Sequence, residues 1–401
     1  METIYEQLGV RTIINATGPA TRLSGSLLPP EVAEAMRAAS QYCVDIAELQ
    51  ARAGQIIAEI TGAEAAYVTS GAAAGLLLGT AACVTGLDPG KMNRLPDTSG
   101  MKNEVIVPRS HRNFYDHAVR STGVRLIEVG IADRFSGAGV RDTEAWEIAD
   151  AITERTAAVL YVAHAHALPP LSQVTGVART AGVPVLVDAA GQLPPASNLQ
   201  RFLLEGADLV VFSGGKAIRG PQSSGILCGR RDLISAAALQ HLDLDILWEQ
   251  WNPPPSLIAK DRLPGAPQHG IGRPCKVGKE EIVGLVTALR RFVAEDPEAR
   301  RRGWVALLER IVSSAGELPA ARFELGDQPG REVPSLTLHL GPRAALTALE
   351  LVQALQDGDP PIQASPTRVR DGVVGFGPMC LREEDPERIG ARLHALLAAS
   401  P

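Results

Sequence analysis

Hydrophobic residues occur as short runs separated by longer segments of helical spacing, from about residue 44 to residue 239. The runs that predict strands are 66–69, 105–107, 126–129, 157–162, 183–187, 209–212 and 226–228. Strands that alternate with helices are typical of a mostly parallel sheet covered by helices. We therefore expect an α/β fold in this part of the chain.

The pattern changes toward the carboxyl terminus. Helices are expected at 279–295, 299–315, 344–356 and 386–398, with strands at 335–340 and 373–376 between them. Tryptophans and a run of prolines in 243–268 indicate a connection between domains or over a subunit edge. We predict an N-terminal arm (1–45), a large domain (46–265) and a small α+β domain (266–401).

Composition and charge exclude several classes of protein. A hydrophobic content of 45% over 401 residues argues against disorder, and a net charge of -6 gives no general attraction to nucleic acid or anionic membranes. The N-terminus lacks the pattern of a secretory signal, and the five cysteines contain no C-x-x-C pair. We expect a cytoplasmic protein that binds a small molecule, with no disulfide framework and no nucleic-acid or membrane partner.

Lys216 is the first candidate for chemistry. It follows the apolar run 209–212 through Ser213-Gly214-Gly215. A run that short predicts a buried strand, and ligands of open α/β sheets bind where such strands end. Partial burial lowers the pKa of a lysine toward the neutral amine that attacks a carbonyl. Lys216 is therefore a candidate Schiff-base residue, and the alternative is a surface lysine after a turn.

Asp188 ends the preceding apolar run, so it is expected at the same sheet edge as Lys216. Pyridoxal phosphate needs a lysine for its aldehyde and a carboxylate that keeps its ring nitrogen protonated, because the protonated ring accepts the electron pair of a carbanion. The lysine and the aspartate, in this order, predict a pyridoxal-phosphate site. An aspartate that only caps the end of a strand is the alternative.

The third part of the predicted site is the turn after the strand at 66–69. This turn contains Ser70, Gly71, Ala72 and Ala73. Main-chain N–H groups at a helix start bind phosphate, and the hydroxyls of Ser70 and Ser213 are expected to add hydrogen bonds. Small residues alone indicate only tight helix packing, but with the lysine and the aspartate they complete a cofactor site.

These motifs resemble a known family. The resemblance rests on 15–18, 61–74, 188–190, 213–216 and 220–222, and it covers nearly the whole chain. The chain is similar to the fold type I pyridoxal-phosphate enzymes related to bacterial selenocysteine synthase, above all to the D-glucosaminate-6-phosphate ammonia-lyase-like branch. The resemblance implies a large domain with a mostly parallel sheet and a smaller α+β C-terminal domain that closes on it. Its motifs are specific for the cofactor and not for the substrate.

Three histidines follow predicted strands at the same edge. The resemblance implies that the ring of His111 stacks on the pyridine of the cofactor, as in the related cysteine desulfurases, with a helix-capping histidine as the alternative. His164 and His166 follow the strand at 157–162. We expect one of them to contact the cofactor or the substrate and assign His166 to the substrate, although which of the two faces the site stays open. A metal is not expected, since two imidazoles make a poor site.

Two arginines are candidates for binding a substrate anion. Arg22 lies in an irregular segment that the resemblance carries toward the active site, and a solvated surface arginine is the alternative. Arg273 precedes the predicted helix at 279–295. The alternative is that the cations near this helix start form ordinary ion pairs with Glu280 and Glu281 on a solvated face.

The expected reaction starts with removal of the Cα proton of an amino acid by Lys216, while Asp188 keeps the cofactor ring protonated. The resemblance favours an α,β-eliminating ammonia lyase that acts on a hydroxylated amino acid or an amino-sugar acid. An amino acid racemase or epimerase, an aldolase and a non-catalytic pyridoxal-phosphate-binding protein are the alternatives. The exact substrate and its stereochemistry stay open. The resemblance also implies a homodimer or higher homo-oligomer, in which residues 220–223 contact the neighbouring subunit.

Overall fold

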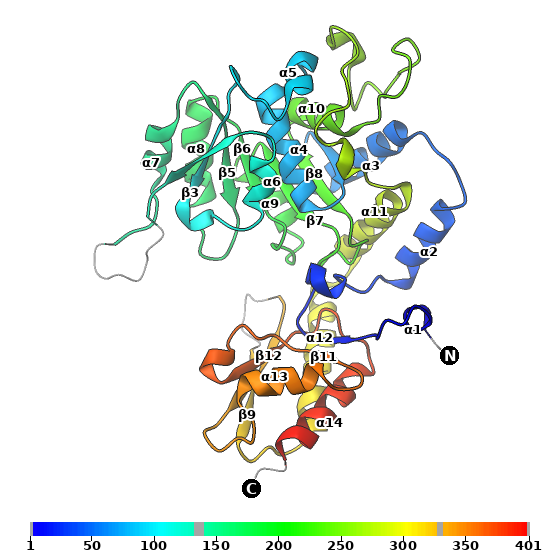
Figure 1. The fold of residues 1–401 in the computed structure, drawn as a ribbon, viewed down its shortest axis with the longest axis vertical. Helices are drawn as coiled ribbons and strands as arrows, with labels where there is room; N and C mark the ends of the chain where they lie inside the picture. The colour runs from blue at the N-terminus through cyan, green and yellow to red at the C-terminus, as the bar shows by residue number, and fades with distance from the viewer. Residues whose placement is uncertain (1–2, 132–139, 327–331, 399–401) are drawn as a thin grey trace. The chain divides into compact units, whose positions relative to one another are not determined.

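The computed structural model describes residues 3–131, 140–326 and 332–398. It divides into two compact units (Figure 1): the large unit is Leu28–Val293, and the small unit joins Met1–Leu27 to Ala294–Pro401. Within the described residues, no helix combines the length and the apolar character needed to cross a membrane.

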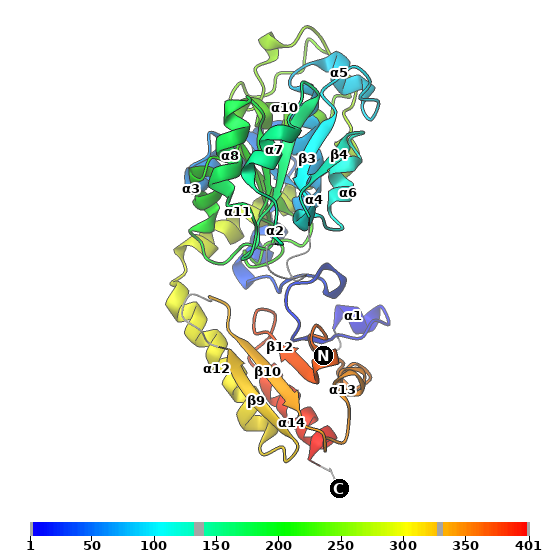
Figure 2. The ribbon, with the colours of Figure 1, turned by 90° about the vertical axis from the view of Figure 1, so that its left-hand side faces the viewer.

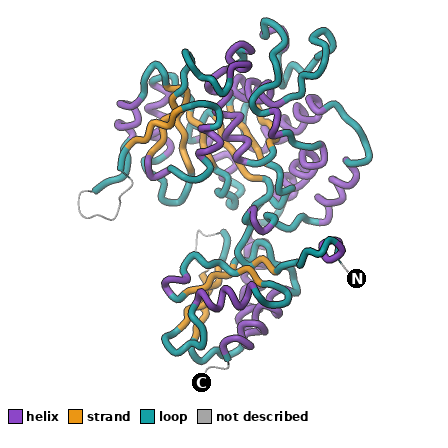
Figure 3. Tube along the Cα trace, viewed as in Figure 1, coloured by secondary structure: helices purple, strands orange, loops and turns teal. Residues whose placement is uncertain are grey.

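A seven-stranded sheet forms the centre of the large unit (Figure 3), in the order β2-β8-β7-β6-β5-β3-β4. Its strands are β2 (Ala65–Thr69), β3 (Glu104–Pro108), β4 (Arg125–Val129), β5 (Thr156–Val162), β6 (Val185–Asp188), β7 (Leu209–Ser213) and β8 (Gly225–Gly229). All run in one direction except β8, which is antiparallel to both of its neighbours. The predicted α/β fold with a mostly parallel sheet is confirmed.

Helices cover both faces of this sheet. The helices of the large unit are α2 (Pro30–Ala39), α3 (Ile46–Thr61), α4 (Ala72–Thr85), α5 (Pro89–Arg94), α6 (Asp116–Arg120), α7 (Ala145–Ala151), α8 (Leu171–Thr180), α9 (Asn198–Leu204), α10 (Arg231–His241) and α11 (Lys279–Ala294). Figure 2 shows α7 and α8 on one side of the sheet and α4 and α6 on the other. Because both faces are covered, the inner strands are apolar throughout rather than alternating.

The small residues of α4 let that helix lie very close to the sheet. A Cβ atom at Gly75 would stand 2.8 Å from Cγ1 of Val211, and one at Gly79 would stand 3.2 Å from Cδ1 of Leu186. The expected tight packing of this helix is therefore real. It brings the amino-terminal turn of α4 directly to the ends of the central strands.

The edge strand β2 is covered by a side chain. Gln50 of α3 is buried, its Nε2 donates to the carbonyl of Val68 at 2.9 Å, and its Oε1 accepts the N–H of Val68 at 3.1 Å. The glutamine amide thus takes the hydrogen bonds of a neighbouring strand and satisfies the edge. A Cβ atom at Gly54 would lie 2.1 Å from the carbonyl oxygen of Ala66, so the helix can approach this closely only with glycine.

The small unit has an α+β architecture, as predicted. A three-stranded antiparallel sheet, in the order β12-β10-β9, combines β9 (Ala321–Gly326), β10 (Ser335–Leu340) and β12 (Val373–Phe376). Its helices are α1 (Ile4–Gln7), α12 (Pro297–Ala315), α13 (Ala348–Gln356) and α14 (Asp385–Leu397). Helix α13 starts later than expected because Thr347 caps it, with its Oγ1 accepting the N–H of Glu350 at 3.3 Å.

The boundaries of the compact units differ from the predicted domains 1–45, 46–265 and 266–401. The N-terminal segment joins the small unit because β1 (Ile14–Asn15) pairs in parallel with β11 (Ile362–Gln363). Helix α11 packs on the large unit, where a Cβ atom at Gly284 would lie 2.7 Å from Cγ of Pro221. The boundary therefore falls at the end of α11 and not before it.

Candidate active site

The predicted site residues of the large unit meet at one edge of the sheet. Because β2, β3, β5, β6 and β7 point the same way, the residues that follow them share the carboxyl edge. This edge carries Ser70, His111, His164, Asp188, Ser213 and Lys216. Open α/β sheets bind their ligands at such an edge.

Lys216 and Asp188 interact at this edge. A Cβ atom placed on Gly191, just beyond Asp188, would lie 4.0 Å from Nζ of Lys216. Asp188 is only 7% exposed, and its Oδ1 accepts the N–H of Ala190 at 3.1 Å. Burial raises the pKa of Asp188, while this N–H and the charge of Lys216 oppose the rise. A carboxylate with a raised pKa is stabilised by any further cation that binds next to it.

The two glycines before Lys216 are required by their surroundings. A Cβ atom on Gly214 would lie 2.2 Å from Oγ of Ser224, and one on Gly215 would lie 2.6 Å from Oε1 of Gln222. The N–H of Gly214 donates to the carbonyl of Ser224 at 2.9 Å, which holds the turn against the start of β8. Only glycine lets the backbone turn here and place Lys216 at the sheet edge.

His111 has a fixed ring. It is 2% exposed, and its Nδ1 accepts the main-chain N–H of Val162 at 3.2 Å, so a neutral ring carries its proton on Nε2. The ring lies edge-on to Tyr161, with the centroids 4.7 Å apart. Its side chain therefore bonds to a strand rather than capping a helix. This geometry agrees with a ring held in place to cover a flat ligand.

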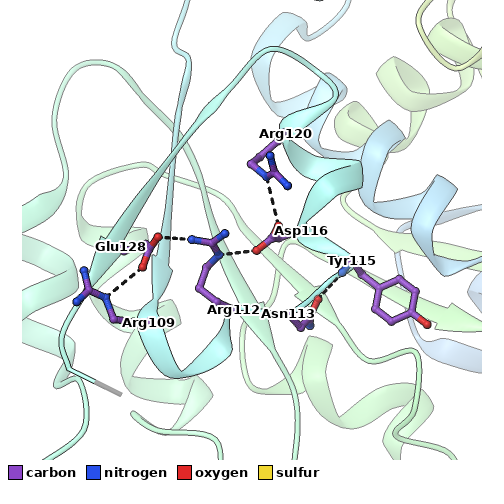
Figure 4. Close-up of polar contacts among 7 residues, drawn as sticks. All are labelled: Arg109, Arg112, Asn113, Tyr115, Asp116, Arg120 and Glu128. Carbon is purple, nitrogen blue, oxygen red and sulfur yellow. Dashed lines mark hydrogen bonds and ion pairs between the residues drawn. The ribbon is translucent and has the colours of Figure 1, made fainter. Parts of the chain in front are cut away.

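A network of charges anchors the turn that carries His111 (Figure 4). Arg109 and Arg112, on either side of that histidine, both pair with Glu128 of β4; the Arg109 Nε to Glu128 Oε2 distance is 3.1 Å. Arg112 also pairs with Asp116, which Arg120 contacts at 3.3 Å. Each pair is partly exposed and stabilises little by itself, but together they tie η2 (Arg109–His111) to β4. Sequence reasoning missed this network, although the i,i+4 spacing of opposite charges around Asp116 signals it.

The ring of His164 lies against the ring of His111. The His164 ring is 5.6 Å from the His111 ring, at an interplanar angle of 70°. The main-chain N–H of His166 donates to Nδ1 of His164 at 3.2 Å, so His166 helps to orient its neighbour. The assignment of His166 to the substrate stays a prediction, and the contact between the His164 and His111 rings makes His164 a second candidate. The alternation of the two histidines could not decide between them, because β5 ends at Val162 and a turn follows.

The turn after β2 forms as expected, with one change in its hydrogen bonds. Gly71 has φ +125°, which favours glycine, and a Cβ atom on Gly225 would lie 2.6 Å from the carbonyl carbon of Gly71. Ala72 then begins α4, whose first turn presents main-chain N–H groups. The hydroxyl of Ser70 donates to the carbonyl of Cys275 at 2.8 Å, so it is used by the protein itself. Sequence reasoning missed both Gly225 and Cys275.

The binding of a substrate anion by Arg273 and Arg22 stays a prediction. Arg273 forms an ion pair with Asp243, which in turn is 3.7 Å from Nε2 of His269. Arg22 is exposed in η1 (Thr21–Leu23) of the small unit. Lys279, near Arg273 in sequence, pairs with Glu280, as the ion-pair alternative predicted.

Comparisons with known proteins agree with this geometry. The family model described as SelA: L-seryl-tRNA selenium transferase matches residues 113–245. A 5'-C-glycyluridine monooxygenase-decarboxylase from Streptomyces sp is 32% identical over 405 residues, covering 98% of this chain and 92% of the relative. A D-glucosaminate-6-phosphate ammonia lyase from Salmonella typhimurium is 30% identical over 403 residues, covering 98% and 97%.

The solved structure of a D-glucosaminate-6-phosphate ammonia-lyase is similar over 99% of both chains, with a TM-score of 0.81 and 29% identity. The resemblance inferred from the motifs is thus confirmed over nearly the full length. The chain belongs to the fold type I pyridoxal-phosphate family related to selenocysteine synthase, in the group that includes D-glucosaminate-6-phosphate ammonia lyase.

Proposed function

We propose that this protein is a pyridoxal-phosphate-dependent ammonia lyase that acts at the Cα atom of a hydroxylated amino acid or amino-sugar acid. The observation that carries the proposal is the buried Asp188 next to Lys216 at the carboxyl edge of the sheet. The relative whose name states ammonia lyase activity is similar over almost the whole chain, which supports the reaction class.

The side chains at this edge fit the cofactor. Lys216 would bind its aldehyde, Asp188 its ring nitrogen, and the turn from Ser70 to Ala73 with Ser213 its phosphate, while the ring of His111 would cover the pyridine. When bound, the cofactor supplies a protonated ring that accepts the electron pair released at Cα. A cationic ring nitrogen would compensate the buried charge of Asp188, which is incompletely compensated by Ala190 and Lys216.

Each residue then has a distinct task. Lys216 takes the proton from Cα of the substrate, and Asp188 holds the proton on the ring nitrogen. A hydroxyl that leaves from Cβ needs a proton. We assign this role to His164: its Nδ1 accepts a main-chain N–H, so a neutral ring carries its proton on Nε2, which would donate it. The hydroxyl leaves as water and a second water later replaces the amine, so the net products are a 2-oxo acid and ammonia without any redox change.

The test offers D-glucosaminate and its 6-phosphate, together with simple β-hydroxy amino acids, in deuterated water. We expect ammonia and a 2-oxo acid in equal amounts, with deuterium in the product. Exchange at Cα with inversion and without ammonia would contradict the lyase and favour a racemase or epimerase. Release of an aldehyde would favour an aldolase, and a purified protein that binds the cofactor but turns over none of these would favour a binding protein.

A second function is favoured by the relative from Streptomyces, whose name describes a monooxygenase-decarboxylase and whose identity is 32%. Such an enzyme would consume O₂ and release CO₂ from the carboxyl group of its amino acid substrate. The ammonia lyase consumes no O₂ and retains the carboxyl group. An oxygen electrode, combined with a substrate labelled in its carboxyl carbon, distinguishes the two functions in one assay.

We further propose that the protein works in the cytoplasm as a homodimer or a higher homo-oligomer. Large apolar side chains that are exposed in the large unit support an interface between copies, and Phe114, at 98% exposure, is the extreme case. Gly220 and Pro221, expected in that interface, are instead buried, with Pro221 against α11, whereas Gln222 and Ser223 are exposed. Sedimentation velocity of the active protein tests this proposal, and an active monomer would contradict it.

A further inference from the structure

A chain of hydrogen bonds links Tyr67, His241 and Cys275 to Ser70 in the turn after β2. The hydroxyl of Tyr67 on β2 is 2.8 Å from Nδ1 of His241, at the end of α10. The Nε2 atom of His241 is 2.9 Å from the carbonyl oxygen of Cys275, which also accepts the hydroxyl of Ser70 at 2.8 Å. Tyr67 and His241 are both buried. The same carbonyl is therefore held from two sides, once by the expected phosphate-binding turn and once by the histidine.

The positions of the protons in this chain are determined by its partners. A carbonyl oxygen can only accept, so Nε2 of His241 carries a proton and donates it to Cys275. Burial lowers the pKa of His241 and the charge of Arg273 lowers it further, although the Cys275 carbonyl raises it. The ring is therefore neutral, and its Nδ1 accepts the hydroxyl proton of Tyr67. Every donor of the chain is used within the protein.

The segment that contains Cys275 is bound along its length to the end of α10. The N–H of Gly272 donates to the carbonyl of Gln240 at 3.0 Å, and the N–H of Ile271 donates to Oε1 of Gln240 at 3.2 Å. A Cβ atom on Gly272 would lie 2.3 Å from Cδ2 of Leu78 on α4. Two consecutive buried polar residues, Gln240 and His241, thus hold this segment against the helix that starts at the turn.

We infer that His241 is a positioning residue for the phosphate of the cofactor, acting through Cys275 and Ser70. This inference rests on the proposed function. With His241 bound to the Cys275 carbonyl, that carbonyl stays satisfied when the single hydroxyl proton of Ser70 turns to a phosphate oxygen. Without His241, Ser70 would have to leave a half-buried carbonyl with no donor, which is costly. His241 therefore makes the hydroxyl of Ser70 available to the ligand.

Two substitutions of His241, to side chains of similar size, distinguish this positioning role from a role in stabilising the fold. His241→Gln places an amide near the position of Nε2 and keeps the donor to Cys275, whereas His241→Asn places it near Nδ1 and keeps only the partner of Tyr67. The cofactor-free full chain is titrated with pyridoxal 5'-phosphate and, separately, with pyridoxal, which lacks the phosphate. His394→Ala is the matched control, because Nδ1 of His394 lies 2.9 Å from a carbonyl of Ala315 in the small unit.

We expect His241→Asn to weaken pyridoxal 5'-phosphate binding about tenfold, the effect of about one hydrogen bond. Its pyridoxal binding is expected to change less than about twofold, and His241→Gln is expected to bind both ligands within about twofold of the wild type. An equal loss for both ligands, or equal behaviour of the Asn and Gln variants, overturns the inference. If His241→Asn does not fold, Ser70→Ala takes its place, and it must show the same phosphate-dependent loss. A wild type that binds neither ligand overturns the proposed function instead.

Discussion

The central sheet buries one carboxylate at each of two opposite edges, and their environments differ. Glu104 begins β3 and is 3% exposed; Asp188 ends β6 and is 7% exposed. Burial opposes ionisation of Glu104, but hydrogen bonds from Arg125 and Thr153 and the charges of both Arg155 and Arg125 outweigh it, so its pKa is lowered. For Asp188, the effect of burial is larger than the opposing effects of the Ala190 N–H and the Lys216 charge, so its pKa is raised.

This difference supports a structural role for Glu104 and the proposed functional role for Asp188. Glu104 already has charged partners from two neighbouring segments, and an added ligand would gain nothing from it. Asp188 has one backbone N–H and the nearby lysine, and its ionised form is disfavoured until a cation binds. Burial alone does not indicate a catalytic carboxylate, whereas burial with incomplete compensation at the carboxyl edge of the sheet supports the proposal of a catalytic Asp188.

The largest effect is expected from Lys216→Ala, which removes the amine next to Asp188 at the carboxyl edge of the sheet. We expect turnover to fall at least about 10³-fold, because both the covalent attachment of the cofactor and the base for the Cα proton are lost. The visible absorbance of the bound cofactor and its reduction by borohydride should disappear as well. Lys102→Ala, at an exposed position of the large unit, is the control. Retention of a reducible bond at full occupancy would mean that another lysine binds the cofactor.

Exchange of the two carboxylates for amides should separate activity from stability. Asp188→Asn is expected to lower turnover about 100-fold or more while making the cofactor-free protein about 1 kcal/mol more stable, because a poorly compensated buried charge is removed. Glu104→Gln is expected to cost about 2 kcal/mol of unfolding free energy, because the charge that holds Arg125 and Arg155 is lost, and to leave turnover nearly unchanged. Urea unfolding and steady-state kinetics measure both quantities. If the two variants behaved alike, the proposed difference between the edges would be wrong.

The stability of the cofactor-free protein should depend on pH with opposite signs at the two edges. The folded pKa of Asp188 lies above its ordinary value of 3.8, so stability falls as pH rises from that value through the folded pKa, where the unfolded chain has already lost its proton. The folded pKa of Glu104 lies below 4.5, so its contribution is present above 4.5 and is lost as pH falls through the folded value. Asp188→Asn should remove only the pH dependence that Asp188 causes, and Glu104→Gln only the one that Glu104 causes. Both are measured as unfolding free energies in urea from about pH 3 to about pH 8. An unchanged dependence in Asp188→Asn would mean that Asp188 is not the group responsible.

The sequence predicted the parts of the fold and site that depend on local pattern. Continuous apolar runs identified the strands. Because β6 and β7 are parallel neighbours, their carboxyl ends bring Asp188 and Lys216 to the same edge whatever the conformation of the loops. The turn at Gly214 and Gly215 could be predicted as well, because a backbone that turns sharply or approaches another segment closely requires glycine. The family resemblance added the ring of His111 to this set.

What the sequence could not predict depends on contacts between distant segments. The pairing of Ser70 with Cys275 and of Arg273 with Asp243 joins residues whose spacing carries no signal. The choice between His164 and His166 depends on where β5 ends, and the strand β9 was missed because its alternating, partly exposed residues lack an apolar run. The compact large unit extends to Val293, beyond the predicted 265, because α11 packs against Pro221, and this contact cannot be predicted from the sequence of α11 alone.

The smallest effect is expected from Glu128→Gln, which weakens the charged network on the His111 turn (Figure 4) without touching either buried carboxylate. Glutamine keeps an acceptor for Arg109 or Arg112 but loses the charge that both arginines share. Because these groups are partly exposed, the cost in unfolding free energy should be about 0.5 kcal/mol, and cofactor affinity should fall about twofold as the turn loosens. Both losses should shrink in 1 M salt, where the Debye length is about 3 Å, whereas the effect of Asp188→Asn on turnover should persist because that charge is buried. A loss of cofactor affinity of about tenfold that salt does not change would contradict this prediction. It would show that Glu128 positions His111 through geometry rather than charge, and that the exposed network contributes to cofactor binding as the buried residues at the carboxyl edge of the sheet do.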